Sequence, residues 1–236
     1  MLVSIHQPNY LPWSGFFHKM LLCDAFVFLD NVPFSKNSYQ NRCRIKTKQG
    51  VNWLTVPVLT SHHFNQSTNE VQIDRRSRWA IKHWRTIQQS YSRASAFTFL
   101  ADSFESAYQE EWQLLADLNI ELITRIARTL GYEGDLVRAT TLGVDGKQSD
   151  LLASICKTMG ATEYLSGPSG RSYLDELVFT EKGIKVSYHT FAPAAYPQTT
   201  GEFEAGLSII DLLANCGSKS KQVLFATTPQ MSAAGE

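Results

Sequence analysis

The sequence has no excess charge of either sign, because 22 lysines and arginines balance 22 aspartates and glutamates. Proteins that bind nucleic acid usually carry a basic excess, so this balance argues against a nucleic-acid partner and leaves only local positive sites. Long apolar runs are also missing: nothing approaches the roughly 18 residues of a membrane-spanning helix, and we expect no membrane span. With 236 residues, 43% of them hydrophobic, the chain is expected to form a single α/β domain over 1–236.

Cysteine pairs of the kind that bind metals or exchange electrons are absent as well. The four cysteines are scattered without a Cys-x-x-Cys pair, and Cys23 and Cys216 lie in apolar helical contexts typical of buried thiols. No secretory signal is visible before the first predicted strand, so we expect a cytoplasmic protein. His62, His63 and His83 have no carboxylate or cysteine partner at ligand spacing, so no metal is expected.

Alternating strand and helix patterns at both ends of the chain predict an α/β fold. A short apolar strand at 2–5 is followed by a helix with Ser14 as its N-cap candidate, and then by a buried strand at 25–29. Such a unit is most simply a right-handed parallel crossover. We therefore predict a Rossmann-like, mainly parallel sheet, with an inserted β-hairpin that turns at Gly50 and a helical insertion over approximately 75–131.

Further elements are predicted from hydrophobic periodicity and from the positions of glycines. The helical insertion shows an almost uninterrupted helical pattern over 102–130, ended by Gly131. Residues 61–69 are expected to be a polar loop, and the tail from Thr227 is expected to fray. The other expected elements are a strand at 71–73, a helix at 76–90, a strand at 136–140, a helix at 145–159, strands at 163–166 and 184–188, and a mostly helical segment at 203–225 broken near Gly217.

The strongest functional motif directly follows the first predicted strand, as His6-Gln7-Pro8-Asn9-Tyr10-Leu11-Pro12-Trp13. Its two prolines fix φ and stiffen the loop, so its polar groups lose little freedom on binding. His6 is a candidate catalytic residue, because imidazole titrates near neutral pH. The candidate substrate-binding residues are Gln7 and Asn9 through their amides, Tyr10 and Trp13 through their rings, and Ser14 and Gly15 through backbone N–H groups. A structural loop stiffened by proline is the alternative interpretation.

Charged candidates cluster around the second predicted strand. Lys36 and Arg42 follow it and are candidate catalytic cations that would hold phosphate, with Lys19 and Asn41 as candidate substrate-binding neighbours. Asp30 stands at the C-terminal end of the strand, where it could orient a cation or a substrate hydroxyl. Neighbouring strand ends form the usual site of open α/β sheets, so these side chains are expected to meet the first motif. Ordinary surface charge is the alternative for each.

Two segments in the second half of the chain add candidate substrate-binding residues. A glycine-rich turn follows the strand at 163–166, and glycines let backbone N–H groups approach a ligand, although the turn matches neither the P-loop nor the G-x-G-x-x-G pattern. Farther on, three polar residues share one helical face that could line a pocket or be solvated. The candidates are Ser166, Gly167 and Tyr173 in the first segment and Ser208, Asp211 and Asn215 in the second.

Together these motifs resemble the WbqC-like protein family. The resemblance covers nearly the whole chain and implies a setting, since the family occurs beside genes for O-antigen and other surface polysaccharides and for modified amino sugars. The segments that carry it are the first motif with Gly15 and Lys19, then Phe28-Leu29-Asp30, Lys36, Asn41-Arg42, Tyr164-Leu165-Ser166-Gly167, Tyr173-Leu174-Asp175, Tyr196-Pro197, Leu207-Ser208 and Asn215-Cys216-Gly217.

A second, weaker similarity involves the opening of nucleotidyltransferases and pantothenate synthetases. Their first strand, proline-containing loop and glycine-bearing helix start look like the first 30 residues of this chain. Those enzymes carry a His-x-Gly-His motif where this chain has Trp13-Ser14-Gly15-Phe16, so both histidines are missing there. The similarity implies ATP as a cofactor, provided that His6 or His18 substitutes.

These resemblances imply a transferase or ligase that acylates the amine of a nucleotide-linked amino sugar in O-antigen or surface polysaccharide biosynthesis. The second substrate would be a small acyl or aminoacyl donor, for example glycine. In this hypothesis His6 takes a proton from the attacking amine, while Lys36 and Arg42 stabilise phosphate charge. The alternatives are a non-catalytic nucleotide-sugar-binding protein and an acyl- or methyltransferase with another diffusible donor. The sequence leaves a homodimer open.

Overall fold

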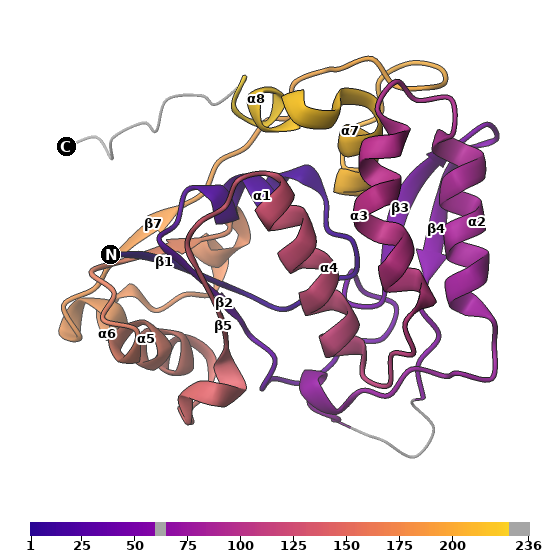
Figure 1. Ribbon diagram of the computed structural model, residues 1–236. Helices are drawn as coiled ribbons and strands as arrows, with labels where there is room; N and C mark the ends of the chain where they lie inside the picture. The colour runs from indigo at the N-terminus through magenta and orange to yellow at the C-terminus, as the bar shows by residue number, and fades with distance from the viewer. Residues whose placement is uncertain (60–64, 227–236) are drawn as a thin grey trace.

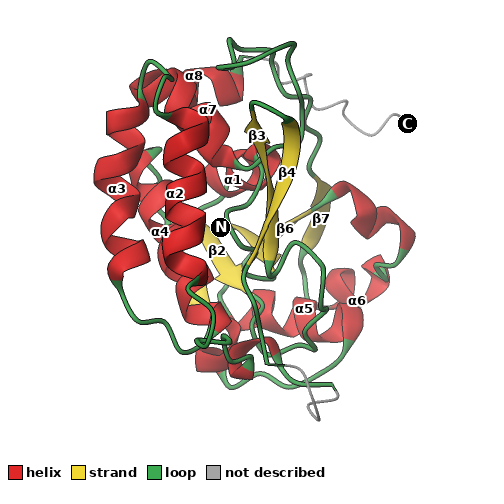
Figure 2. Ribbon diagram, turned by 90° about the vertical axis from the view of Figure 1, so that its right-hand side faces the viewer, coloured by secondary structure: helices red, strands yellow, loops and turns green. Residues whose placement is uncertain are grey.

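The computed structural model describes residues 1–59 and 65–226, and within them the chain forms two sheets (Figures 1 and 2). The larger sheet has the strand order β5-β2-β1-β6-β7, and every pairing in it is parallel. Its strands are β1 (Leu2–His6), β2 (Ala25–Phe28), β5 (Asp135–Arg138), β6 (Glu163–Ser166) and β7 (Lys185–Tyr188). The smaller sheet is the antiparallel hairpin of β3 (Arg42–Thr47) and β4 (Gly50–Thr55). The predicted Rossmann-like α/β fold with an inserted hairpin is therefore confirmed.

Strand β1 lies at the centre of the parallel sheet, between strands from two distant parts of the chain. Val3 is in register with Ala25 of β2 on one side and with Tyr164 of β6 on the other. Helix α1 (Ser14–Leu21) connects β1 to β2, and helix α5 (Gln148–Thr158) precedes β6. From β1 the chain first adds β2 and β5 on one side of the sheet, and it later adds β6 and β7 on the other side. The connections after β1 and β6 therefore lead to opposite sides of the sheet. Such a divergence opens a crevice at the carboxyl ends of the two strands, which is called the topological switch point.

The two faces of the sheet are covered by different helices (Figure 1). Side chains alternate along a strand, so Val3 and Ile5 of β1 pack on one face with residues of α5 and α6 (Glu176–Glu181). Phe26 and Phe28 of β2 point to the opposite face, where they join the core formed with α1 and the helical insertion. These buried apolar contacts fix both helix layers against the strands whose ends form the crevice.

The helical insertion comprises α2 (Trp79–Tyr91), α3 (Phe97–Gln109) and α4 (Leu115–Thr129). The almost uninterrupted helical pattern predicted over 102–130 is broken in the structure, since residues 110–114 separate α3 from α4. The backbone of this break bonds to the segment predicted as a strand at 71–73: Ile73 N donates to Gln113 O, and Leu115 N donates to Val71 O. That segment makes isolated bridges only. A long-range backbone contact therefore overrides the local helical pattern.

The last part of the chain is less helical than predicted. Residues 203–208 are not helical, and the helices are α7 (Ile209–Cys216) and α8 (Ser220–Phe225), separated by a 3₁₀ turn at Gly217–Lys219. Short 3₁₀ turns also occur at Thr68–Glu70, Ala139–Leu142 and Pro168–Ser172. The prediction that α1 is capped by Ser14 is wrong by one position, because Trp13 occupies the N-cap and makes no side-chain capping bond.

Parts of three predictions fall outside the described residues. These are the first four residues of the polar loop at 61–69, with His62 and His63 among them, and the tail from Thr227. In the part of the chain that the structure describes, no helix combines the length and the apolar character that a membrane crossing requires.

Asp30 fastens the end of β2 to the turn that follows β5. Its side chain is fully buried, and Oδ2 accepts hydrogen bonds from Arg138 Nε at 2.7 Å and Thr140 Oγ1 at 3.0 Å. Oδ1 accepts a third from the backbone N–H of Thr140 at 3.0 Å. Both oxygens of this carboxylate therefore accept hydrogen bonds from the protein itself. The expected catalytic role of Asp30 in orienting a substrate group is therefore replaced by a structural one.

We expect Asp30→Ala to lower the free energy of unfolding by about 3 kcal/mol, because it leaves Arg138 without its buried partner. Asp117→Ala is the matched control, since Asp117 is the more exposed partner of the same guanidinium and should cost less than about 1 kcal/mol. Urea unfolding followed by circular dichroism measures both. Equal losses in the two variants would contradict the role given to Asp30.

Candidate functional site

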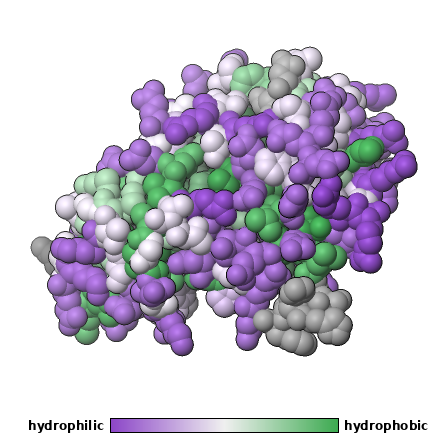
Figure 3. All heavy atoms as spheres, turned by 60° about the horizontal axis from the view of Figure 1, so that its bottom comes forward, coloured by the Kyte–Doolittle hydropathy of each residue, from purple (hydrophilic) through white to green (hydrophobic). Residues whose placement is uncertain are grey.

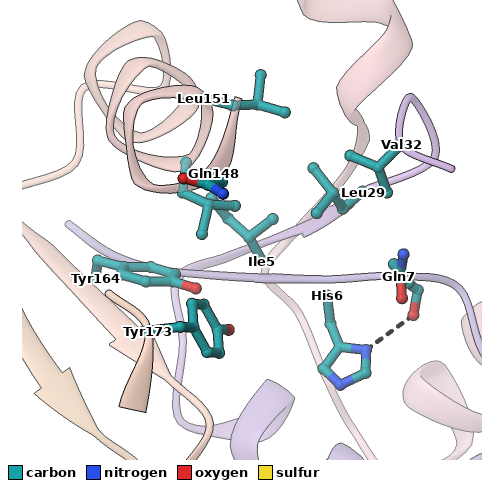
Figure 4. A pocket seen from close by; sticks show the side chains of 10 residues that line it. Ile5, His6, Gln7, Leu29, Val32, Gln148, Leu151, Tyr164 and Tyr173 are labelled. Atoms are coloured by element: carbon teal, nitrogen blue, oxygen red, sulfur yellow. Dashed lines mark hydrogen bonds between the residues drawn. The ribbon is translucent and has the colours of Figure 1, made fainter. Parts of the chain in front are cut away.

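A cavity of about 540 Å³ opens at the switch point between the carboxyl ends of β1 and β6 (Figure 4). We call it the switch-point cavity. Its size falls within the range of small-ligand sites. The lining residues are Ile5, His6 and Gln7 from the end of β1, Leu29 and Val32 after β2, Gln148, Leu151 and Leu152 at the start of α5, and Tyr164 and Tyr173 from β6 and the turn after it.

The lining of the switch-point cavity consists of uncharged side chains, with histidine and glutamine as its polar members. Tyr164 is buried and stacks on Phe179, with ring centroids 5.2 Å apart, so its position is fixed. Tyr173 is 61% exposed and can present its ring to a ligand. Apolar walls with a few convergent polar groups suit a neutral ring such as a sugar or a base. Figure 3 shows one face of the molecule, on which apolar residues interrupt the hydrophilic surface.

His6 is half-buried at the end of β1, and its ring packs edge-on against Phe16 with centroids 5.0 Å apart. Its Nδ1 lies 2.9 Å from the backbone oxygen of Gln7, as Figure 4 shows. A carbonyl only accepts, so Nδ1 carries the proton in this bond and Nε2 keeps a free lone pair. Burial, with a smaller contribution from the positive charge of Lys19, lowers the pKa of His6 to about 3. The imidazole is therefore a neutral hydrogen-bond acceptor near pH 7.

Lys19 of α1 is only 3% exposed, and its ammonium group lies 5.8 Å from the ring centroid of Phe26. Burial lowers the pKa of Lys19 to about 8. Nearby, His18 Nδ1 lies 2.8 Å from His189 Nε2, just after β7. Burial, then the charges of His18 and Lys19, lower the pKa of His189 to about 3. We call His6, Lys19, His18 and His189 the basic cluster.

The rest of the first motif is divided between core and surface. Tyr10 is fully buried, and its hydroxyl bonds to His83 Nδ1 at 2.8 Å and to Tyr108 Oη at 2.7 Å. The Tyr10 ring therefore has no exposed face on which a ligand could stack, contrary to its expected role. Trp13 is 39% exposed and contacts Phe191 instead of the cavity. Gly15 lies directly under the Trp13 ring, where an added Cβ would come within 2.4 Å of ring atoms.

Two further members of this motif contribute no lining side chain. Asn9 and Ser14 are both half-buried, and neither belongs to the residues around the switch-point cavity. The loop itself is held from α4, because the buried Asn119 donates to Pro8 O at 2.9 Å and to Gln40 O at 2.7 Å. No sequence signal pointed to Asn119, which follows an ordinary helical pattern.

The structure does not bring Lys36 and Arg42 to the switch-point cavity, contrary to the expectation that they converge with His6. Lys36 is exposed, and the Arg42 guanidinium stacks 4.2 Å from the ring centroid of Trp53 on the hairpin. Asn41 is buried and structural: its Nδ2 donates to Val56 O at 3.1 Å. The segment after β2 turns toward the hairpin, which carries these cations away from the sheet edge.

The candidates in the second half also separate. Ser166 is fully buried at the end of β6, and its Oγ donates to Gly167 O at 3.2 Å, so only Tyr173 of this group lines the cavity. The second group lies on α7. Ser208 caps this helix by accepting from Ile210 N. The group is thus structural in part, and none of its residues lines the switch-point cavity.

Asp211 fastens the loop before α7 to the helix. It is fully buried, and its Oδ1 accepts from Tyr196 Oη at 2.8 Å and from Gln198 Nε2 at 3.0 Å. Burial raises the pKa of this carboxyl above its usual value. Asn215 accepts from Thr199 Oγ1 at 3.0 Å and lines a separate hollow of about 320 Å³. The expected pocket role of this helical face therefore does not concern the switch-point cavity.

Several lining residues were not predicted from the sequence. Leu29, Val32, Leu151 and Leu152 are ordinary aliphatic residues, and only the fold places them around a cavity. Gln148 has a positive φ of 50°, which is uncommon for a residue other than glycine and is often found at functional sites. Among the described residues, no group of three or more histidines, cysteines and carboxylates is placed to hold a metal ion.

Comparison with known proteins gives two consistent matches. Residues 7–223 match the model of the WbqC-like protein family. The chain is also 39% identical over 224 residues to the uncharacterized protein Rv1507c of Mycobacterium tuberculosis (strain ATCC 25618 / H37Rv), an alignment that covers 94% of this chain and 96% of that protein. The matched region includes Gln7, Tyr164 and Tyr173 of the switch-point cavity.

The lowered pKa of His6 predicts that stability falls in mild acid. Because the folded-state pKa of about 3 lies below the unfolded value of 6.5, the unfolded chain binds more protons between these pH values, so stability is lost as pH falls below 6.5. His6→Gln should reduce the slope of the free energy of unfolding against pH by at most about 1.4 kcal/mol per pH unit. Urea unfolding of both proteins from pH 7 to pH 4 checks this, and parallel curves would contradict it.

Proposed function

Because the chain belongs to the WbqC-like protein family, we propose that it is a transferase or ligase that acylates the amine of a nucleotide-linked amino sugar. The acyl group would come from a small acyl or aminoacyl donor, in the biosynthesis of O-antigen or another surface polysaccharide. The observation that carries the proposal is the switch-point cavity, which combines uncharged walls with an unprotonated imidazole at its edge.

The shape and chemistry of the cavity support a sugar as the occupant. Tyr173 offers an exposed ring against which the apolar face of a sugar can pack. The side-chain amides of Gln7 and Gln148 can both donate to and accept from sugar hydroxyls. Aliphatic side chains that follow β2 and those of α5 form the remaining walls. Such a site binds a polar ring without needing a charged side chain.

His6 is assigned to the amine. During acyl transfer the nitrogen attacks the acyl carbon, the N–C bond forms, and the leaving group departs with the electron pair of the broken bond. The attacking nitrogen becomes positively charged and far more acidic than the free amine, so even a weak base can take its proton. A neutral Nε2 suits this role, since the low pKa of His6 keeps it unprotonated near pH 7.

Binding without turnover is the second candidate, and one observation favours it. The residues around the switch-point cavity include no lysine, arginine, aspartate or glutamate that could stabilise a developing charge. A nucleotide-sugar-binding protein needs only the walls and the amides. Product formation distinguishes the two functions.

We expect the purified protein, given nucleotide-linked amino sugars with ATP and glycine or with acetyl-CoA, to form an N-acylated product detectable by mass spectrometry. His6→Gln should lower turnover by about 100-fold while substrate still binds, because it removes the proton acceptor and keeps a polar side chain. Full turnover in this variant would remove His6 from the mechanism. Sugar binding with no product for any donor would leave the binding protein as the correct function.

Tyr173→Ala should weaken nucleotide-sugar binding by up to about tenfold, because it removes the exposed ring from the cavity. Tyr39→Ala is the matched control: Tyr39 is 49% exposed, lies beside Trp53 of the hairpin, and should bind as the unchanged protein does. Isothermal titration calorimetry measures both affinities. The cavity is the wrong site if the Tyr39 variant loses affinity and the Tyr173 variant does not.

A further inference from the structure

The hollow of about 320 Å³ that Asn215 lines has no part in the proposed function. It lies between the turn of the hairpin, the end of α2, the segment 197–200 and α7, and we call it the polar hollow. Strand β3 and helices α2 and α7 contact one another, and Figure 1 shows them on the side of the molecule opposite to α5 and α6. The polar hollow shares no lining residue with the switch-point cavity, so it is a separate site.

Part of this lining is fixed by hydrogen bonds that converge on Asn215. Its Oδ1 accepts from Thr199 Oγ1 at 3.0 Å, and its backbone oxygen accepts from Ser95 Oγ at 2.9 Å. Its Nδ2 donates to Asp211 O at 2.8 Å, which fixes the orientation of the amide. Ser95, Thr199 and Asn215 all line the polar hollow, although they come from distant parts of the sequence. A lining held in place in this way loses little freedom when a ligand binds.

Other lining side chains keep their hydrogen-bond donors free for solvent or a ligand. Lys48 at the hairpin turn and Arg93 just after α2 are exposed, and neither forms an ion pair within residues 1–59 and 65–226. The side chains of Gln89, Ser90 and Thr200 also make no hydrogen bond within those ranges. Two unpaired positive charges from different elements therefore border one hollow, together with an amide and two hydroxyl groups.

Negative groups near the polar hollow are already engaged by the protein. No aspartate or glutamate is among the described residues that line it. Gln198, which does line it, donates to Glu204 O at 3.0 Å and to Asp211 Oδ1 at 3.0 Å. The Glu204 carboxylate pairs with Arg44 at 2.7 Å, and the buried Asp211 carboxylate also accepts from Tyr196. Neither carboxylate pairs with Lys48 or Arg93.

Helices α2 and α7 both end beside the polar hollow, and the C-terminus of a helix carries a partial negative charge that would oppose an anion. Carbonyl oxygens at these ends already accept hydrogen bonds from the chain. Gln88 O accepts from Ser92 N at 2.9 Å, and Ala214 O accepts from Ala96 N at 2.9 Å. The two full charges of Lys48 and Arg93 exceed what remains of these dipoles, so the hollow favours an anion.

We propose that the polar hollow binds a phosphate group, with Lys48 and Arg93 as its cations. Two positive charges match the charge of about −1.5 to −2 that a phosphate monoester carries at pH 7, whereas a carboxylate would neutralise only one of them. The Arg93 guanidinium can bind two phosphate oxygens at once, and the Lys48 ammonium group adds a point charge. The inference goes beyond the proposed function and does not rest on it.

The size and the neutral lining of the hollow indicate which phosphate compound fits. Its volume of about 320 Å³ is at the lower end of the range for small-molecule sites, so it suits one phosphorylated ring better than a whole nucleotide-linked sugar. Gln89, Ser90 and Thr200 can exchange hydrogen bonds with the hydroxyl groups of such a ring. A sugar phosphate and free phosphate are therefore the two sources of the group that the experiment compares.

The test titrates the full-length protein with glucose 6-phosphate, inorganic phosphate and glucose, and follows the backbone amide resonances of Ser95 and Thr200 by NMR. Both phosphate compounds should shift these resonances, and glucose should not. Arg93→Met and Lys48→Met should each weaken binding about tenfold, since each removes a charged donor.

Each of these variants has a matched control. Arg85→Met removes an exposed arginine of α2 that does not line the hollow, and Lys157→Met removes an exposed lysine of α5. Both controls should bind phosphate as the unchanged protein does. All four positions are exposed, so the fold is expected to be retained, and circular dichroism checks this. Arg93→Glu, which reverses the charge, should abolish binding.

Tighter binding of glucose 6-phosphate than of inorganic phosphate identifies a sugar phosphate as the occupant, and equal or weaker binding identifies free phosphate. The proposal is overturned if neither compound shifts the two resonances at tens of millimolar, if Arg93→Met and Lys48→Met bind as the controls do, or if glucose binds as tightly as its phosphate. Tyr173→Ala changes only the switch-point cavity and should leave phosphate binding unchanged. A protein that binds phosphate here and forms no acylated product would refute the acyltransferase and confirm this site.

Discussion

The parallel pairing of β1 with both β2 and β6 is the constraint on which the site depends. Because the chain leaves β1 toward β2 and returns much later to β6, the connections at the carboxyl ends diverge and leave a crevice between them. The cavity is lined by residues at and after the ends of these strands and by the start of α5. Moving either pairing would separate His6 from Tyr164 and Tyr173, and the proposed sugar site would not form.

Several buried polar side chains among the described residues connect separate parts of the fold. Asp30 and Asp211 are both fully buried, and each accepts hydrogen bonds that tie a loop to a strand or a helix. Tyr10 does the same between the first motif and the helical insertion. Lys19 is almost as buried, and its ammonium group lies 5.8 Å from the ring centroid of Phe26.

The proposed chemistry follows from desolvation. Burial keeps His6 neutral near pH 7, and the uncharged walls of the cavity suit the neutral sugar ring of the proposed function. The same burial makes the frame sensitive to acid, because protonating the imidazoles requires charge in a dry environment. Function and acid stability thus share one physical origin.

The sequence by itself determined the local structure of the sheet and its class. The patterns predicted β1, β2 and β6 closely, Gly131 follows α4 with the positive φ of 77° expected of a C-cap glycine, and the helical segment at the end of the chain does break at Gly217. It also marked His6, Gln7 and Tyr173, which line the cavity. It could not show that residues 110–114 would pair with the backbone at 71–73, or that Lys36 and Arg42 would follow the hairpin. Periodicity describes contacts within a few residues, whereas these positions and the aliphatic walls of the cavity result from contacts between distant segments, which only the tertiary structure decided.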